Sequence, residues 1–224
     1  YREQMLAATA AGYTELKQLI AERRERPGED LLSTLIHLEE EGTRVHESEL
    51  LGMVGAIVIA GSDTTVHTMR FLLLDLLQNP EVLERVRRDP GLVRSAMEES
   101  LRFNNFNRLS APLYALEDAN LHGVEVAKGQ TVFTLTAAAG RDPAVFVHPD
   151  RFDIDRPDLA EARSFGVGPH TCLGIHLARL ETEVAIPLIL ERFPTMTLAG
   201  PPVYGQNAFF RAIKELPVRV VPAA

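Results

Sequence analysis

The sequence predicts a mainly α fold of the α+β kind, helix-rich with small β-sheets. Three observations predict it. Apolar residues recur at helical spacing as far as Phe103, one helical pattern is unbroken from about Glu47 to Gln78, and strand-like runs appear only after Asn104. Of the 224 residues, 46% are hydrophobic, which excludes a disordered chain, and the length predicts a single domain over 1–224.

The part from residue 1 to 104 is predicted to be helical. Proline, glycine and a capping residue divide it into helices at about 6–20, 30–38, 47–78, 80–88 and 91–103. Asp30 is the expected cap of the second helix, which Glu39-Glu40-Glu41-Gly42 closes. The middle of the third, Ile57 to Gly61, is apolar nearly all round, so we expect it to run through the core.

The part from residue 105 to 172 is predicted to hold small strands and a long loop. The runs 124–126 and 130–135 read as short strands on either side of Lys128-Gly129. Residues 140–170 are rich in Pro, Asp, Gly and Arg and predict an irregular loop, which inside a domain is usually functional. The part from 173 to 224 predicts a last helix, at about 173–193, followed by short C-terminal strands.

Charge and cysteine content limit the class of protein. The formal net charge of −8 argues against a nucleic-acid partner, which would require a basic face. A single cysteine excludes an intrachain disulfide and favours a reducing compartment, so we expect a cytoplasmic protein. No signal peptide is visible, and the most apolar stretch, Leu50 to Gly61, is shorter than the roughly 18–20 residues of a membrane span, so no membrane partner is expected.

The strongest local signal is the run from Phe165 to Gly174, which contains the only cysteine, Cys172. Its glycines allow tight turns, and the positive end of the helix that follows stabilises a thiolate. Gly174 keeps a side chain away from whatever the sulfur binds, as a flat partner such as a haem requires. Two other interpretations stay open: a buried structural cysteine, and a zinc site using His170 and His176, although a structural zinc prefers four ligands.

The order of three motifs resembles the C-terminal part of the cytochrome P-450 family of haem-thiolate monooxygenases, most closely the soluble bacterial type. Phe165-Gly166-Val167-Gly168-Pro169-His170-Thr171-Cys172-Leu173-Gly174 matches the cysteine loop at every fixed position, Glu99-Ser100-Leu101-Arg102 matches the Glu-x-x-Arg helix, and Ala60-Gly61-Ser62-Asp63-Thr64-Thr65 matches the oxygen-activating helix. The resemblance covers essentially the whole chain and implies that the N-terminal part of the fold is absent, as in a fragment or an unusually short form.

The resemblance implies roles for particular residues. Cys172 would be the axial ligand of the iron of haem b (iron protoporphyrin IX), and its sulfur would favour O–O cleavage. Further haem contacts are expected from Phe165, Gly166, His170, Gly174, Ala60 and Arg108. Arg108 is included because Leu113 stands where many relatives carry a propionate-binding arginine. A second departure is Gly140, where relatives usually have asparagine.

Two further groups follow from the same resemblance. Asp63 and Thr64 would be catalytic, with Asp63 relaying protons and Thr64 holding oxygen while they arrive. Glu99 and Arg102 would form a structural ion-pair cluster with an arginine of the loop, for which Arg156 is the first candidate and Arg151 the second. Substrate contacts are expected from Ala56, from Leu109 within 107–112, and from Asn207 and Ala208.

The function implied is insertion of one atom of O2 into a small apolar organic substrate, with electrons from a ferredoxin and ferredoxin-reductase type donor. A non-catalytic fragment or auxiliary haem-binding partner is the alternative. The intact set of Cys172, Asp63 and Thr64 favours the enzyme, because an auxiliary protein has no need of both the sulfur and the acid–alcohol pair. A haem-thiolate isomerase or peroxide-using enzyme is disfavoured for the same reason.

Overall fold

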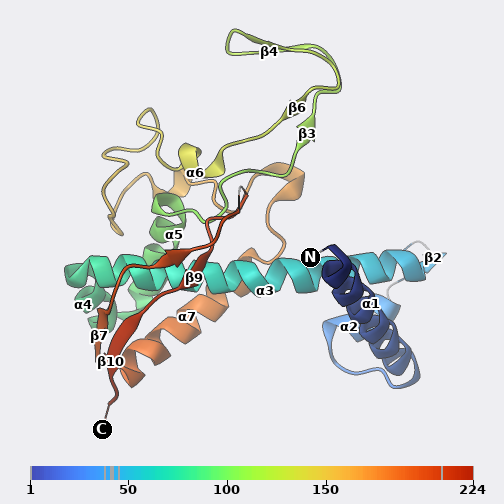
Figure 1. Cartoon of the computed structure of the whole chain (residues 1–224), viewed down its shortest axis with the longest axis horizontal. Coiled ribbons are helices and arrows are strands. Elements are labelled where there is room, and N and C mark those ends of the chain that lie inside the picture. The colour runs from blue at the N-terminus through green and yellow to red at the C-terminus, as the bar shows by residue number, and fades with distance from the viewer. Residues whose placement is uncertain (1, 38, 41–42, 45, 208, 224) are drawn as a thin grey trace. The chain divides into compact units, whose positions relative to one another are not determined.

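The computed structural model describes residues 2–37, 39–40, 43–44, 46–207 and 209–223 (Figure 1). The chain divides into two compact units, Tyr1–Asp63 and Thr64–Ala224, and each is described by itself. The boundary falls inside the long helix α3, Glu47–Gln78, which begins and ends where the sequence predicts.

The first unit is built from α1 (Arg2–Glu25), α2 (Leu31–His37), the strands β1 (Glu39–Glu40) and β2 (Thr43–Arg44), and the first half of α3. Its small core consists of Ile20, Leu50, Leu51 and Val54. Asp30 caps α2 as predicted: the amide of Ser33 donates to Asp30 Oδ1 at 2.8 Å, and this bond, with one from Arg23, lowers the pKa of Asp30 to about 2. The β1–β2 pairing was not predicted, and the predicted helix end at Leu38 and the closing Glu41-Gly42 lie outside the described residues.

The expectation that the middle of α3 runs through the core is wrong for this chain. Ile57, Val58 and Ile59 are 37%, 53% and 77% exposed. The apolar character of this stretch indicates that a covering layer is required, but within the described residues nothing covers it.

Helix α3 also bears on the membrane prediction. By length and composition alone, Ser48–Gln78 could cross a membrane. The sequence prediction considered only the unbroken apolar run from Leu50 to Gly61, which is too short to span a bilayer. The C-terminal half of the helix is nevertheless a core helix of the second unit, because Phe71, Leu72 and Leu76 are almost completely buried there.

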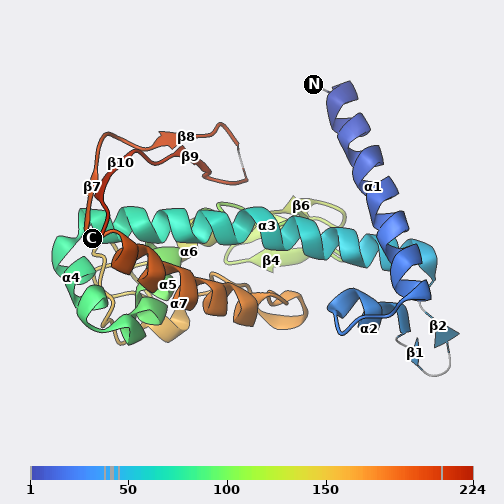
Figure 2. The same cartoon turned by 90° about the horizontal axis from the view of Figure 1, so that it is seen from below.

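The second unit packs its helices around one hydrophobic core. After α3 come α4 (Pro80–Arg88), a 3₁₀ turn (Pro90–Leu92), α5 (Val93–Phe103), the short α6 (Thr136–Ala139) and α7 (Ile175–Arg192). Helix α5 packs on α7 (Figure 2), and the core contains Val93, Met97 and Leu101 of α5 together with Ile186 and Leu190 of α7. The predicted helices at 80–88, 91–103 and 173–193 are thereby confirmed to within three residues at each end.

The strands form antiparallel pairs rather than one sheet. The pairs are β3 (Leu113–Tyr114) with β6 (Thr131–Val132), β4 (Ala119–Leu121) with β5 (Val124–Val126), β7 (Thr195–Leu198) with β10 (Val218–Val221), and β8 (Val203–Tyr204) with β9 (Ile213–Glu215). In Figure 1 the first two pairs make an arm that extends away from α5 and α6. Between α6 and α7 the chain is irregular apart from two 3₁₀ turns, as predicted for 140–170.

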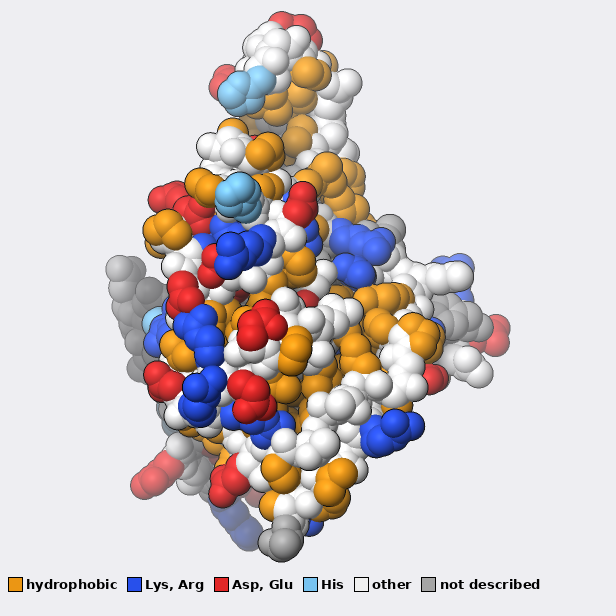
Figure 3. All heavy atoms as spheres, turned by 90° about the vertical axis from the view of Figure 1, so that its left-hand side faces the viewer, with side chains coloured by type: hydrophobic (Ala, Val, Ile, Leu, Met, Phe, Trp, Pro, Cys, Tyr) orange, Lys and Arg blue, Asp and Glu red, His pale blue; other side chains and the backbone are white. Residues whose placement is uncertain are grey.

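The surface near α4 carries both signs of charge. On the face that Figure 3 shows, basic and acidic side chains lie next to one another among hydrophobic ones. One pair on α4 is bidentate: Arg85 donates to both carboxylate oxygens of Asp155, at 2.7 and 2.8 Å, and this lowers the pKa of Asp155. Such pairs fix the loop after α6 against the helices.

Candidate active site

Cys172 lies at the end of a loop that turns tightly just before α7. Its amide donates to the carbonyl of Phe165 at 2.8 Å, which closes the loop. Gly166 and Gly168 adopt φ values of 75° and 71°, a left-handed conformation that glycine takes without strain. The thiol of Cys172 is free and the residue is exposed, so the interpretation as a buried structural cysteine is wrong for this chain.

The surroundings of the sulfur fit a flat group that brings most of its own metal ligands. A Cβ added at Gly174 would lie 4.0 Å from Cys172 Sγ, beside the sulfur where such a group would have to approach. In the part of the chain that is described, no three His, Cys, Asp or Glu side chains come together to hold a metal ion. One sulfur donor would suit an iron for which a porphyrin supplies most of the other ligands. Leu173, 88% exposed, adds apolar surface next to it.

The loop is held to the core from its two ends. The ring of Phe165 is half-buried against the main core, and the guanidinium of Arg179 on α7 lies 5.5 Å from its centroid. Arg179 also pairs with Glu98 of α5 at 2.6 Å. His170 is exposed in the 3₁₀ turn Gly168–His170, on the same short loop as Cys172, where its ring can reach a ligand or water.

Asp63 and Thr64 both lie on α3. Asp63 is exposed, Thr64 is half-buried, and the helix continues through them without interruption. The side chains of Ser62 and Thr68 donate back to carbonyls one turn earlier, Ser62 to Val58 at 2.6 Å and Thr68 to Thr64 at 3.0 Å. Ala56 and Ala60 are exposed on the same helix, but they and Asp63 belong to the first unit.

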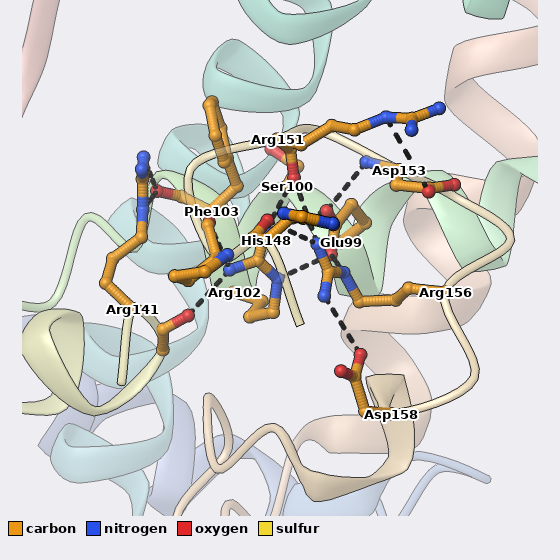
Figure 4. A network of polar contacts seen from close by, with 12 residues as sticks. Glu99, Ser100, Arg102, Phe103, Arg141, His148, Arg151, Asp153, Arg156 and Asp158 are labelled. Carbon is orange, nitrogen blue, oxygen red and sulfur yellow. Dashed lines mark hydrogen bonds and ion pairs between the residues drawn. The ribbon is translucent and has the colours of Figure 1, made fainter. Parts of the chain in front are cut away.

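The predicted charged cluster is assembled at the centre of the second unit (Figure 4). Arg102 donates two hydrogen bonds to the carboxylate of Glu99, of 2.6 and 2.8 Å, and both side chains are fully buried. Arg156 Nε lies 2.9 Å from Glu99 Oε2, and its Nη1 lies 2.9 Å from Asp158. The backbone N–H of Val147 and then Arg156 hold the pKa of Asp158 below its usual value.

The cluster ties the irregular loop to α5. Arg102 donates to the carbonyls of Gly140, Pro149 and Arg151, and the amide of Asp153 donates to Glu99 Oε1 at 2.8 Å. Arg151 therefore contributes its carbonyl rather than its side chain, which is 71% exposed.

The departure at Gly140 has a steric reason. A Cβ at this position would lie 2.4 Å from the carbonyl oxygen of Arg102, so this backbone admits no side chain there. The next residue, Arg141, donates twice to the carbonyl of Phe103 and so satisfies the C-terminal end of α5.

The two segments predicted to contact substrate lie together although they are far apart in the sequence. Arg108 donates its amide to the carbonyl of Phe209 at 2.8 Å, and Asn107 forms a bridge with Phe210. Asn207 uses its Oδ1 to accept the amides of Phe209 and Phe210, so it shapes the turn. Leu109 is half-buried beside this junction in the sequence, the side chain of Arg108 is exposed, and Ala208 lies outside the described residues.

A second buried network was missed by the sequence reasoning. Asp75 of α3 is fully buried and accepts from Ser100 at 2.6 Å and from Asn104 at 2.5 Å. Burial raises the pKa of Asp75 to about 7, and the two hydrogen bonds oppose the rise. The one sequence signal for this network is the polar pair Ser100 and Asn104. They are four residues apart, in α5 and at its C-terminal cap, and therefore lie on one face of the helix.

Comparison with known proteins agrees with this geometry. The family model described as Cytochrome P450 matches residues 3–90 and 91–209. The chain is 42% identical over 220 residues to the Epothilone C/D epoxidase of Sorangium cellulosum, covering 98% of this chain and 52% of that protein. It is 39% identical to the Biotin biosynthesis cytochrome P450 of Bacillus subtilis, covering 96% and 53%.

Solved structures agree as well. The epothilone B-bound cytochrome P450epoK superposes with a TM-score of 0.94 at 41% identity, covering 100% of this chain and 56% of that one. The structure of P450BioI in complex with an acyl carrier protein gives a TM-score of 0.87 at 38% identity, covering 95% and 54%. The chain thus spans about half the length of the relatives it matches. With the cysteine loop, the Glu99–Arg102 pair and the matched fold in place, the chain belongs to the cytochrome P450 family.

Proposed function

We propose that this chain is the part of a haem-thiolate monooxygenase that carries the sulfur ligand and the proton-delivering helix. The observation that carries the proposal is the exposed Cys172, presented before α7 by a glycine-containing loop, with Gly174 leaving room beside its sulfur. The substrate is a small apolar organic molecule, O2 is the oxidant, and electrons come from a ferredoxin-type donor. The protein acts in the cytoplasm, without nucleic-acid or membrane partners.

Haem b would be held by Cys172 through iron, with Phe165, Gly166 and Gly174 on the sulfur side and His170 and Arg108 as donors to its propionates. Ala60 stays a further candidate for haem contact because of its small size. When bound, a thiolate-ligated haem supplies the cleavage of the O–O bond. Glu99, Arg102 and Arg156 keep the loop before Cys172 attached to α5, which is a structural role.

Proton delivery is assigned to α3. Asp63 is exposed, so its carboxylate can exchange protons with water, and Thr64 is half-buried on the next position of the helix. A hydroxyl can both accept and donate a hydrogen bond, so the side chain of Thr64 could pass a proton inward while holding its acceptor in place.

The substrate is assigned to the aromatic junction between the two contacting segments. Phe106 stacks on Phe210 with ring centroids 6.2 Å apart, and Phe133 lies 6.3 Å from Phe209. These rings favour an apolar molecule. Leu109 and Asn207 border this junction along the chain, and Ala56 stays a further candidate for substrate contact.

The test compares product formation with electron use in the haem-loaded protein, joined to the remaining part of the fold and supplied with a redox partner. Thr64→Ala should keep haem and substrate binding but divert electrons into hydrogen peroxide, so product per NAD(P)H falls. Asp63→Asn should slow turnover by about 10²–10⁴-fold, the usual cost of losing a proton-transfer group.

Thr65→Ala is the matched control, since it removes the same hydroxyl from the neighbouring position and should leave coupling unchanged. Unchanged coupling in Thr64→Ala, together with normal turnover in Asp63→Asn, would favour the alternative of a non-catalytic haem-binding partner.

A further inference from the structure

The β8–β9 hairpin is attached to the C-terminal half of α3 through two adjacent side chains of the helix, Arg70 and Phe71. Figures 1 and 2 show the hairpin beside this half of the helix. Arg70 Nη1 donates to the carbonyl of Ile213 at 2.8 Å. The ring centroid of Phe71 lies 5.6 Å from the guanidinium of Arg211 and 6.4 Å from the ring of Tyr204. The hairpin is therefore attached to α3 on both of its strands.

A third attachment of the hairpin to α3 passes through the side-chain amide of Asn104, which follows α5. The donor and acceptor ends of this amide have different partners. Asn104 Nδ2 donates to Asp75 Oδ1 at 2.5 Å, and Asn104 Oδ1 accepts from Arg211 Nη1 at 3.1 Å. An amide has one donating and one accepting end. Because the carboxyl oxygen of Asp75 accepts, it selects the nitrogen end, which leaves the oxygen end for Arg211. Asp75 is fully buried, so water does not compete for this bond.

Arg211 in turn fixes the turn between the strands. Its Nη2 donates to the hydroxyl of Tyr204 at 3.1 Å, its guanidinium lies 4.6 Å from that ring, and its amide donates to the carbonyl of Phe106 at 2.7 Å. Arg211 directly follows Phe210, whose amide is bound by Asn207. A displacement of Arg211 would therefore move the turn that carries Asn207 and Phe210.

We propose that Asp75, acting through Asn104 and Arg211, is a positioning residue that fixes the turn carrying Asn207 and Phe210 relative to Thr64. Thr64 and Asp75 lie on one continuous helix, so a turn anchored at Asp75 is held at a constant place with respect to Thr64. The inference rests on the proposed function, in which this turn contacts the substrate.

The direction of the amide gives a decisive test. Asp75→Leu removes the acceptor that faces Asn104 Nδ2, so nothing then selects the nitrogen end of that amide, and a turned Asn104 would present its NH₂ to Arg211. Asp75→Asn is the conservative variant: it keeps an accepting oxygen toward Asn104 and can donate its NH₂ to the hydroxyl of Ser100, so it should preserve the relay. The double variant Asp75→Asn/Asn104→Asp also keeps a donor facing an acceptor at both steps. The amide introduced at position 75 would donate to the carboxylate introduced at position 104, and that carboxylate would accept from Arg211. Ser100→Ala is the matched control, because it removes the other hydrogen bond of Asp75 and leaves the relay intact.

The first readout is amide hydrogen exchange of residues 203–215 in the haem-free chain. We expect exchange there to quicken about tenfold in Asp75→Leu, the effect of one lost buried hydrogen bond, and to stay within about twofold of the parent in Asp75→Asn and in the double variant. Ser100→Ala should leave this segment unchanged. If Asp75→Leu does not fold, Arg211→Gln shortens the side chain at the half-buried end of the relay and should show the same acceleration.

The second readout is the binding of 4-phenylimidazole and of imidazole to the haem-loaded protein, followed by the Soret shift. In the proposed function the added phenyl group would meet the substrate-contacting turn, whereas the smaller imidazole would not, so Asp75→Leu should weaken only 4-phenylimidazole, several-fold, and Asp75→Asn should leave both affinities unchanged. Absence of haem binding would overturn the proposed function and leave the exchange result to decide this inference. Equal exchange in the parent and in Asp75→Leu, or the same acceleration in Asp75→Asn, would overturn the inference itself.

Discussion

At the scale of single residues, the polar contacts that matter most for stability are those of side chains buried away from water. Glu99 and Arg102 are both completely buried, and Glu99 accepts from Arg102 and from the amide of Asp153 and forms a second ion pair with Arg156. Removing one partner of such a buried pair leaves the other charge without compensation, which costs far more than a surface ion pair contributes.

Glu99→Gln should lower the free energy of unfolding by about 3–5 kcal/mol, because Arg102 and Arg156 would keep their charges without a counter-charge. Urea unfolding at neutral pH measures the change. Arg151→Ala is the control: its side chain is largely exposed and 3.8 Å from Asp153, so a change within about 0.5 kcal/mol is expected. Similar losses in both variants would show that the cluster does not hold the loop.

Asp75 should make stability depend on pH. Its pKa is about 7 in the folded chain because of burial, against a usual value of 3.8, so the folded state binds the proton more tightly than the unfolded state. Its contribution is complete below about pH 4, is lost as the pH rises through 7, and then levels off, with a slope of up to about 1.4 kcal/mol per pH unit. Asp75→Asn should remove this component when unfolding is measured from pH 4 to 8. An identical pH profile in the variant would contradict the assignment.

Sequence reasoning predicted the local pair directly, predicted the distant pairing of Glu99 with Arg156 only through the family resemblance, and missed the other distant contacts. Glu99 and Arg102 are one helical turn apart, so their pairing could be read directly. Asp75, Asn104 and Arg211 are separated from one another by 29 and 107 positions, and no periodicity links them. Gly140 also could not be interpreted, since its cause is the approach of a distant carbonyl.

At the scale of elements, local pattern determines where helices begin and end, but not what covers them. The limits of α3 and α4 follow from Asn79-Pro80 and the flanking polar residues, and they agree with the structure. The burial of α3 does not follow, because an apolar face shows only that a partner is required. Strand pairing was equally unreadable: β5 pairs with β4 and β6 with β3, through runs of two or three residues.

The exposed middle of α3 has a direct consequence for stability. Ile59→Glu should change the free energy of unfolding of this chain by no more than about 0.5 kcal/mol, because the side chain is already in water. Leu74→Ala, at a buried position on the same helix, should cost about 2–5 kcal/mol. Thermal unfolding followed by circular dichroism compares the two. A large loss in Ile59→Glu would mean that this face is covered in solution.

At the scale of the whole molecule, the chain spans about half the length of its relatives and yet contains the complete cysteine loop, the charged cluster and the Asp63–Thr64 pair that we propose to deliver protons. The exposed apolar residues of α3 and those beside Cys172 indicate where a further layer of protein is required. That layer would exclude water and so strengthen the polar interactions around the site. Fold and family were predictable from three motifs, and the resemblance implied a missing part of the fold, but which apolar residues are exposed became visible only in three dimensions.

The central claim is that the sulfur of Cys172 ligates haem iron, and the carbon monoxide spectrum of the reduced protein tests it most directly. The protein is loaded with haem, joined to the remaining part of the fold, reduced and exposed to carbon monoxide, with Cys172→Ser as the matched variant. We expect a Soret band near the wavelength that gives the family its name, and its loss in Cys172→Ser because a hydroxyl is a far weaker ligand than a thiolate. A band typical of histidine ligation, or the same band in Cys172→Ser, would contradict the account.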